Sequence, residues 1–276
     1  MSRLLPAAAL ERYRRDGFYF PVSVLTPAEA LEHRRRLEAV EAAHGGRLGG
    51  ELRSKPHLLF TWLADLVRHP AILDAVEDLL GPDLLVWSSS FFIKEARDPA
   101  YVSWHQDATY WGLSAPDVVT AWVALTDATV DNGAMRMVPG SHGEQLVHHD
   151  TFAPHNLLSR GQEIAVEVDE ARAVDVVLRA GEMSLHHVRM VHGSSANRSD
   201  DRRVGFAIRY VPTSLKQLAG DDDCATLVRG VDRHHHFTLE RSPTADLAPE
   251  ARAQHAESVA RAAKILYRGT GIERFR

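Results

Sequence analysis

The sequence is poor in cysteine, in long apolar runs and in excess charge of either sign. Its single cysteine, Cys224, cannot form an intramolecular disulfide, and such sparse usage is typical of a reducing compartment. No apolar run approaches the length needed to cross a bilayer, and the N-terminus has no apolar core next to a basic segment. We therefore expect no secretory leader, no membrane span and a cytoplasmic location.

The balance of charge narrows the class of partner. The formal net charge is -5, whereas proteins that bind nucleic acid or anionic membranes carry basic surfaces. Apolar residues make up 45% and charged residues 25% of the 276 positions, which is enough for a substantial core. We expect a globular protein whose partner is a small molecule, with no nucleic acid and no membrane, and we leave a homodimer open.

Helical patterns dominate the first third of the chain and return at its end. Thr26 and Glu29 form a capping box around Pro27, which suits the first position of a helix. Gly81 is a suitable residue to end a further helix. The expected helices are 7–15, one that begins at 26, 70–80 and 249–267.

From Leu84 the apolar pattern changes to a period of two. About eight strands without long helices between them predict a mainly β protein with flanking helices, a double-stranded β-helix of the jelly-roll or cupin-like kind. We expect one domain, with a mainly helical part at 1–82, a jelly-roll core at 83–212 and a C-terminal extension with a helix at 213–276. The expected strands are 84–94, 104–107, 118–125, 134–138, 166–169, 173–178, 182–187 and 204–211.

The chemistry of the chain centres on a His-X-Asp motif within 102–107. His105 and Asp107 are two residues apart, so on an extended segment both side chains leave the same face. His192 precedes a Gly-Ser pair far downstream and is a candidate third ligand. A lone His-X-Asp is also compatible with a surface turn or a packed core histidine. Two histidines and one carboxylate, however, form the facial triad of non-haem Fe(II) oxygenases.

The ordered set of motifs resembles the phytanoyl-CoA dioxygenase family of Fe(II)- and 2-oxoglutarate-dependent oxygenases. Arg203 follows His192 at the family spacing, eleven residues later, and the resemblance extends from about Asp16 to Pro212. It implies a jelly-roll fold, Fe(II) as cofactor, 2-oxoglutarate as cosubstrate and O2 as oxidant. Further segments that fit the pattern are Asp127, 131–134 and 139–142.

The resemblance assigns His105, Asp107 and His192 as catalytic iron ligands and Arg203 as the residue that binds the far carboxylate of 2-oxoglutarate. A guanidinium suits that task because it donates two parallel charge-assisted hydrogen bonds to one carboxylate. Arg202 should face the opposite way on an extended segment, which predicts a solvated or ion-paired residue.

Three further side chains are expected near the cosubstrate. The resemblance implies that Ser194 and Thr120 donate hydroxyl groups to the same carboxylate, although strand hydroxyls commonly have no such role. Lys94 ends the long strand at 84–94, where relatives also carry lysine. It either contacts substrate or cosubstrate or forms a simple surface ion pair.

Substrate contacts are expected from Trp111 and His186, which fall where relatives place the wall of the substrate pocket. Trp111 has a plain core role as its alternative. His186 and His187 are adjacent, so only one of them can point inward on a strand. The run at 234–236 is expected to be an exposed loop, since three consecutive residues of a strand cannot converge on one ion.

The resemblance also bears on the reaction. Related halogenases carry a small residue at the carboxylate position, so Asp107 favours hydroxylation. We expect a dioxygenase that hydroxylates an unactivated C–H bond of a small polar metabolite or natural-product intermediate and releases succinate and CO2. The alternatives are desaturation, epoxidation or ring closure by the same oxidant, or a non-catalytic metal-binding jelly-roll sensor.

Overall fold

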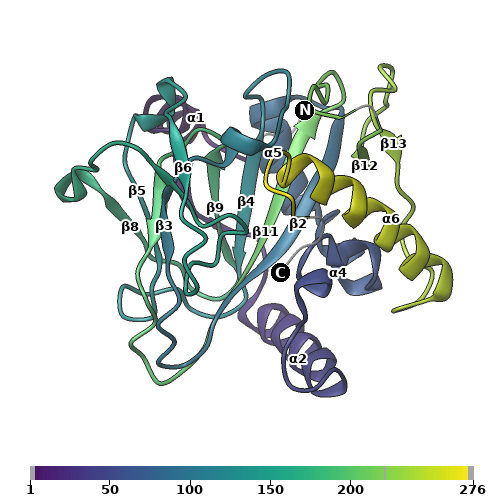
Figure 1. Ribbon diagram of the computed structural model, residues 1–276, viewed down its shortest axis with the longest axis horizontal. Coiled ribbons are helices and arrows are strands. Elements are labelled where there is room, and N and C mark those ends of the chain that lie inside the picture. Colours follow the sequence, from purple (N-terminus) through teal and green to yellow (C-terminus); the bar gives the residue numbers. More distant parts are fainter. Residues whose placement is uncertain (1–3, 221, 273–276) are drawn as a thin grey trace.

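In the computed structural model, which describes residues 4–220 and 222–272, two sheets face each other and helices cover the outer face of the larger one (Figure 1). Within these residues the larger sheet has seven strands, in the order β1 (Phe18–Ser23), β9 (Glu182–His187), β4 (Val119–Ala124), β11 (Arg203–Pro212), β2 (Leu84–Lys94), β12 (Cys224–Arg229) and β13 (Thr238–Leu239). The facing sheet has four, in the order β3 (Val102–His105), β10 (His192–Ser194), β5 (Met135–Met137) and β8 (Val174–Val176). A separate pair consists of β6 (His148–Asp150) and β7 (Gln162–Ile164).

Most helices lie before the sheets in the chain, and one long helix follows them. The α-helices are α1 (Ala7–Asp16), α2 (Pro27–Ala43), α3 (Gly50–Arg53), α4 (Thr61–Leu66), α5 (Pro70–Leu80) and α6 (Pro249–Leu266). Short 3-10 segments occur at η1 (Pro56–Leu58), η2 (Asp107–Tyr110), η3 (Ser141–Gly143) and η4 (Glu170–Arg172). None of the helices in the described ranges is both long and apolar enough to cross a membrane.

The predicted helices form where capping residues occur in the sequence. The Thr26 hydroxyl accepts a hydrogen bond from the Glu29 amide at 3.2 Å, and the Glu29 carboxylate accepts one from the Thr26 amide at 2.7 Å. These two bonds satisfy amide groups that the first turn of α2 would otherwise leave unpaired. Gly81 ends α5 with a positive φ of 87°, which suits glycine.

The long strands lie where the period-two pattern predicts them, and the fold class is confirmed as a jelly roll with flanking helices. Two expected strands are wrong in detail. The segment 166–169 is not a strand, and 162–164 pairs with β6 instead. Asp107 does not continue the strand of His105 but begins η2. Sequence patterning also missed β6, β7, β10, β12 and β13. Four of these have only two or three residues and are set by their pairing partners, whereas β12 has six.

Strand β11 shows how the two faces of the larger sheet differ. Val204, Phe206 and Ile208 belong to the core that packs against the helices. Alternate residues face the space between the sheets, where Arg203 and Arg209 line a cavity. Every residue of β11 except its last is buried, since both faces of the strand are covered. The polar groups of the interior are therefore held by a strand in the middle of the sheet.

The interior between the sheets is divided into an apolar end and a polar end. Side chains from both sheets form the apolar end, a cluster that includes Trp122, Met137 and Ala207. The polar end lies around β3 and β10 and contains the candidate site. The helix α6 packs beside η1 at the margin of the larger sheet (Figure 1). That the whole chain forms one domain stays a prediction.

Candidate active site

The site is organised by the pairing of β3 with β10, which brings together two segments far apart in the sequence. His192 is the register partner of His105, and Asp107 follows two residues later at the start of η2. Gly193 permits this pairing, because a Cβ atom at that position would lie 2.9 Å from the carbonyl oxygen of Val102. The Gly after the histidine therefore has a packing reason in the structure.

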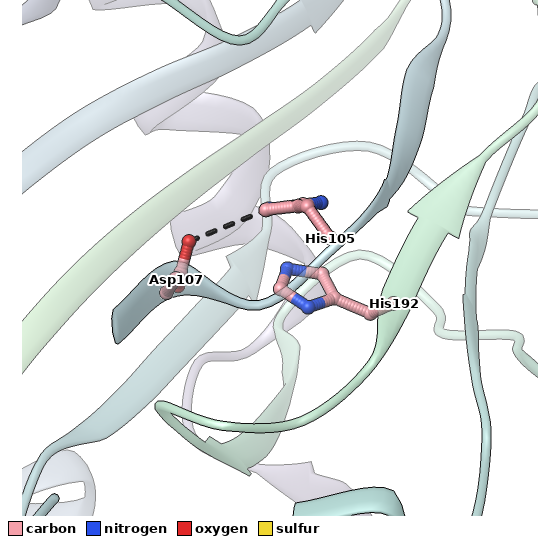
Figure 2. A group of neighbouring side chains, drawn as sticks. All are labelled: His105, Asp107 and His192. Atoms are coloured by element: carbon pink, nitrogen blue, oxygen red, sulfur yellow. Dashed lines mark ion pairs between the residues drawn. The ribbon is translucent and has the colours of Figure 1, made fainter. Parts of the chain in front are cut away.

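His105, Asp107 and His192 converge, and their candidate ligand atoms all lie within 4.8 Å of one another (Figure 2). His105 Nε2 is 3.4 Å from Asp107 Oδ1, and the centroids of the two imidazole rings are 4.1 Å apart. All three side chains are buried. The structure thus brings together the three residues that the motif spacing predicts as ligands.

Hydrogen bonds to backbone carbonyl groups orient both imidazoles. Nδ1 of His105 is 2.9 Å from the Ser103 oxygen, and Nδ1 of His192 is 2.9 Å from the Met190 oxygen. Because a carbonyl oxygen only accepts, each Nδ1 carries the proton and each Nε2 keeps a free electron pair. Two such nitrogens and a carboxylate in one buried space suit a divalent metal such as Fe(II).

The electrostatics of the site favour the protonation states that metal binding needs. Burial, reinforced by the neighbouring His105, holds the pKa of His192 well below its usual value. For Asp107, burial acts in the opposite direction, but the close contact with His105 and the nearby His192 and Arg209 together hold its pKa below the usual range. At neutral pH the site therefore presents a neutral His192 and an ionised Asp107.

Arg203 lies at the inner end of the interior, on the face of β11 that looks toward the metal ligands. Its guanidinium donates a hydrogen bond to the Gly133 carbonyl and lies over the Trp122 ring, 5.3 Å from the centroid. Its Nε is buried and has no hydrogen-bond partner among the described residues. Burial lowers the pKa of Arg203 to about 10, so the group is still a cation at neutral pH. The side chain is thus available to an anion.

Lys94 is the register partner of Arg203 on β2 and is fully buried. Its ammonium donates hydrogen bonds to Ser194 Oγ at 2.7 Å and to the Ser195 carbonyl. Burial and the charge of Arg203 lower the pKa of Lys94 to about 6. No carboxylate in residues 4–220 and 222–272 forms an ion pair with it, so the alternative of a surface ion pair is wrong.

An inner cavity connects the metal ligands with Arg203 at this cationic end. Thr120 lines it, and its buried Oγ1 has no hydrogen-bond partner among the residues described. His186 lines it too, with its ring centroid 4.9 Å from that of His192, and burial lowers its pKa to about 4. His187 faces the other way and packs against His142, with ring centroids 5.3 Å apart. Of the two adjacent histidines, His186 is the one that points inward.

A second, larger outer cavity adjoins the inner one, and Asp107, Phe92 and Arg209 line both. Trp111 lies on the wall of the outer cavity and packs against Trp87 with ring centroids 4.9 Å apart. Trp111 is half-buried and packs against a hydrophobic cluster that contains Trp87, so its role as a substrate contact stays a prediction. Strand β2 supplies six lining residues, from 87–88 and 90–93, and further parts of the wall come from 50–55, 157–162 and 262–266.

Sequence reasoning missed two residues of this region. Arg209 lies six positions after Arg203 on the same face of β11, so the even spacing within one predicted strand was the available signal. Gln106 is fully buried between two of the predicted ligands. Its amide donates to the carbonyl oxygens of Arg189 at 2.7 Å and Glu144 at 2.9 Å, which fixes the loop that carries Asp107. No spacing in the sequence indicated those partners.

Other predicted residues lie away from the interior. Arg202 forms ion pairs with Glu41 at 2.6 Å and Glu95 at 2.7 Å, as its position next to Arg203 on an extended segment predicts. The turn at 139–142 supports the site from behind, because the Ser141 hydroxyl accepts a hydrogen bond from the backbone amide that precedes His192. The segment 234–236 is a largely exposed loop.

Comparison with known proteins agrees with this geometry. A family model described as phytanoyl-CoA dioxygenase (PhyH) matches residues 13–205. An L-proline trans-4-hydroxylase of Streptomyces griseoviridis is 28% identical over 225 residues, which cover 72% of this chain and 84% of that relative.

Solved structures resemble the whole chain. The apo structure of ThoJ, named a non-heme monooxygenase, is 44% identical with a TM-score of 0.83, covering 93% of this chain and 96% of ThoJ. The structure of CytC3 with Fe(II) and alpha-ketoglutarate is 26% identical with a TM-score of 0.66, covering 90% of this chain and 99% of CytC3. The resemblance therefore includes a protein that holds the metal and cosubstrate expected here.

Proposed function

Because the chain belongs to the phytanoyl-CoA dioxygenase family, and is an Fe(II)- and 2-oxoglutarate-dependent dioxygenase, we propose that it hydroxylates an unactivated C–H bond of a small polar metabolite or natural-product intermediate. One observation carries the proposal. A buried His-Asp-His cluster lies between a cavity with a cationic end, suited to a dicarboxylate, and a second cavity with room for another molecule.

The metal would be held by His105, Asp107 and His192. The backbone hydrogen bonds of the two imidazoles direct both Nε2 atoms at the metal, and Asp107 supplies a negative charge. Three protein ligands leave coordination positions open for other molecules. Bound Fe(II) supplies oxidation by dioxygen, coupled to the conversion of 2-oxoglutarate into succinate and CO2.

The cosubstrate would lie in the inner cavity, with its far carboxylate at Arg203. The unpaired Nε of Arg203 and the unpaired hydroxyl of Thr120 face this space, and each is a buried polar group that a carboxylate would satisfy. Lys94 would hold Ser194 in place and add a second positive charge when protonated. Thus the buried polar groups that lack protein partners are those a dicarboxylate needs.

The prime substrate would lie in the outer cavity, against Trp111, and reach the metal past Asp107. His186, buried beside His192, would form part of the wall next to the reacting carbon and is neutral at physiological pH. The outer cavity is the larger of the two, and the rings of Trp87 and Trp111 line it, which supports a natural-product intermediate with an apolar body more than a free amino acid.

Asp107 supports hydroxylation, because its carboxylate occupies the ligand position that halogenation would leave free. Relatives named as a hydroxylase and a monooxygenase support catalysis over a metal-sensing role. Desaturation, epoxidation and ring closure would use the same residues, so they differ from hydroxylation in the product alone.

The test is succinate formation by the purified protein with Fe(II), 2-oxoglutarate and O2, while natural-product intermediates and small polar metabolites are screened for stimulation. Mass spectrometry of the stimulating compound should show the gain of one oxygen atom, which isotopically heavy O2 should label. His192→Ala is the matched control and should form neither succinate nor product. Stimulation with loss of two hydrogens and no added oxygen would contradict hydroxylation.

A further inference from the structure

Arg209 is a buried cation at the junction of the two cavities. It is 8% exposed and lines the inner and the outer cavity. Its guanidinium lies over the rings of Phe92 and Trp111, 5.6 and 5.7 Å from their centroids, and donates a hydrogen bond to the Ser90 hydroxyl. Its buried Nε has no hydrogen-bond partner, and it forms no ion pair within the described part of the chain.

A buried charge without a counterion is costly and calls for an explanation. Arginine cannot escape this cost by losing its proton, since its pKa lies far above neutral even when burial lowers it. The negative charge that acts on Arg209 is that of Asp107, and a metal bound to Asp107 would neutralise this charge. The protein thus keeps a positive group on the path from the outer cavity to the metal.

The other charged groups of the outer cavity do not supply a counterion. Lys55 is already neutralised by Glu240, at 2.6 Å. Asp223 accepts hydrogen bonds from the Trp87 indole at 2.6 Å and the Gln217 amide at 2.9 Å, so its carboxylate is engaged. The remaining basic group, Arg53, also has a buried Nε without a partner. Apart from Asp107, the wall therefore offers Arg209 no carboxylate that is free of other partners among the described residues.

Arg209 is separated along the strand from Arg203, where the far carboxylate of 2-oxoglutarate would bind. Six residues of extended strand lie between them, which corresponds to roughly 20 Å along β11. Arg203 lines the inner cavity alone, whereas Arg209 lines both cavities. Two arginines this far apart on one strand face suit two different anionic ligands.

We propose that the prime substrate is an organic acid whose carboxylate or phosphate group binds Arg209, while its apolar ring or chain packs against Trp87 and Trp111. This inference rests on the proposed function and specifies the substrate class of the same site. The aromatic wall fits an apolar ring or chain, and the guanidinium fits one acidic group.

The experiment measures binding by calorimetry to protein loaded with Ni(II) and 2-oxoglutarate, which excludes turnover by the iron enzyme. The probes are 2-naphthoate and its neutral counterpart 2-naphthamide. A charge-assisted hydrogen bond is worth about 1.5–3 kcal/mol, so wild-type protein should prefer the acid by roughly 10- to 150-fold. Arg209→Gln should remove this preference by weakening naphthoate binding, while naphthamide binding changes by less than about threefold.

Three controls accompany the variant. Arg53→Gln removes another cation from the same wall and should reduce the preference by less than about threefold, since Arg53 is partly exposed and screened. The affinity of Arg209→Gln for 2-oxoglutarate should remain within about threefold of wild type. Arg209→Lys, which keeps the charge, should retain part of the preference for naphthoate. It replaces Arg209→Gln in the comparison if melting curves show that Arg209→Gln is not folded.

Several results would overturn the inference. One is that wild-type protein binds 2-oxoglutarate but shows no preference for naphthoate, or no binding of either probe. Another is that Arg53→Gln removes the preference as fully as Arg209→Gln. A third is that Arg209→Gln loses 2-oxoglutarate instead, which would make Arg209 a cosubstrate residue. Failure of wild-type protein to bind 2-oxoglutarate at all would instead contradict the proposed function.

Discussion

The inner and outer cavities share a border at Asp107 but are built differently. Strands of both sheets line the inner cavity, so each side chain is fixed by a ladder of backbone hydrogen bonds. The outer wall combines strand β2 with α3, a loop near 160 and the end of α6. The inner cavity is suited to one small cosubstrate of constant shape. The outer wall can change by loop substitution without loss of the sheets, so it is where substrate choice would be set.

The two cavities also differ in how they treat charge. In the inner one, Arg203 and Lys94 stand side by side, and burial lowers the pKa of both. In the outer one, Lys55 is neutralised by Glu240, and Arg209 keeps its charge unpaired. Unpaired buried cations thus occur at the points where each ligand would place an anion. The predictions below test whether the two cavities can be disabled separately.

The largest loss of activity is expected for substitutions of the three metal-ligand candidates, which lie where the two cavities meet. His192→Ala, and likewise His105→Ala and Asp107→Ala, should lower succinate formation by at least ~100-fold, because removing a ligand costs more than removing a residue that only orients one. The melting temperature should stay close to that of wild type, since the apolar core is separate from the cluster. Near-normal metal binding and turnover by His192→Ala would show that the cluster is not the metal site.

The next effect should be confined to the inner cavity. Arg203→Lys replaces a bidentate contact by a single one, a loss of about 1–3 kcal/mol that corresponds to a rise of roughly 5- to 150-fold in KM for 2-oxoglutarate. KM for the prime substrate should change much less. Arg202→Lys is the matched control, because its partners Glu41 and Glu95 lie outside the cavities. Equal effects of the two variants would contradict the assignment of Arg203.

A substitution in the wall of the outer cavity should leave the unstimulated conversion of 2-oxoglutarate unchanged. Trp111→Ala should weaken substrate-stimulated turnover and spare the slow conversion of 2-oxoglutarate without substrate. The free energy of unfolding should fall by about 1–2 kcal/mol, less than the ~3–5 kcal/mol for truncating a fully buried tryptophan, because Trp111 is half-buried. Succinate assays with and without substrate, together with melting curves, check this. Proportional loss of both rates with a large drop in melting temperature would place Trp111 in the core instead.

The smallest expected effect is the uptake of a proton when 2-oxoglutarate binds. The pKa of Lys94, about 6 in the free protein, leaves it mostly neutral at neutral pH. A bound dianion should raise that pKa, so at about pH 7.5 binding of 2-oxoglutarate should take up as much as roughly one proton. Affinity should then fall as the pH rises through the raised pKa of the complex. Calorimetry in buffers of different ionisation enthalpy measures the uptake, and Lys94→Met should abolish it.

Local sequence information determined much of the framework and the set of candidate ligands. The caps at Thr26 and Gly81 act over a few residues, and the period-two pattern of β11 reflects the difference between its two faces, one in the apolar core and one toward the polar interior. The ordered His105, Asp107, His192 and Arg203 spacing already predicted what β3, β10 and β11 would bring together. Motif spacing is effective here because the chemistry requires these residue types in a fixed order along neighbouring strands.

Only the tertiary structure decided how the site is completed. The strand β10 exists because it pairs with β3 and β5, and three residues carry too little pattern to predict it. Burial of Lys94 excludes the surface ion pair that its sequence position allowed. The outer cavity joins α3, a loop near 160 and α6, so no local pattern could indicate it. Whether Arg209 has a counterion depends on which carboxylates pack around it. Distant segments of the chain supply those neighbours, so the spacing of residues along the chain cannot indicate them.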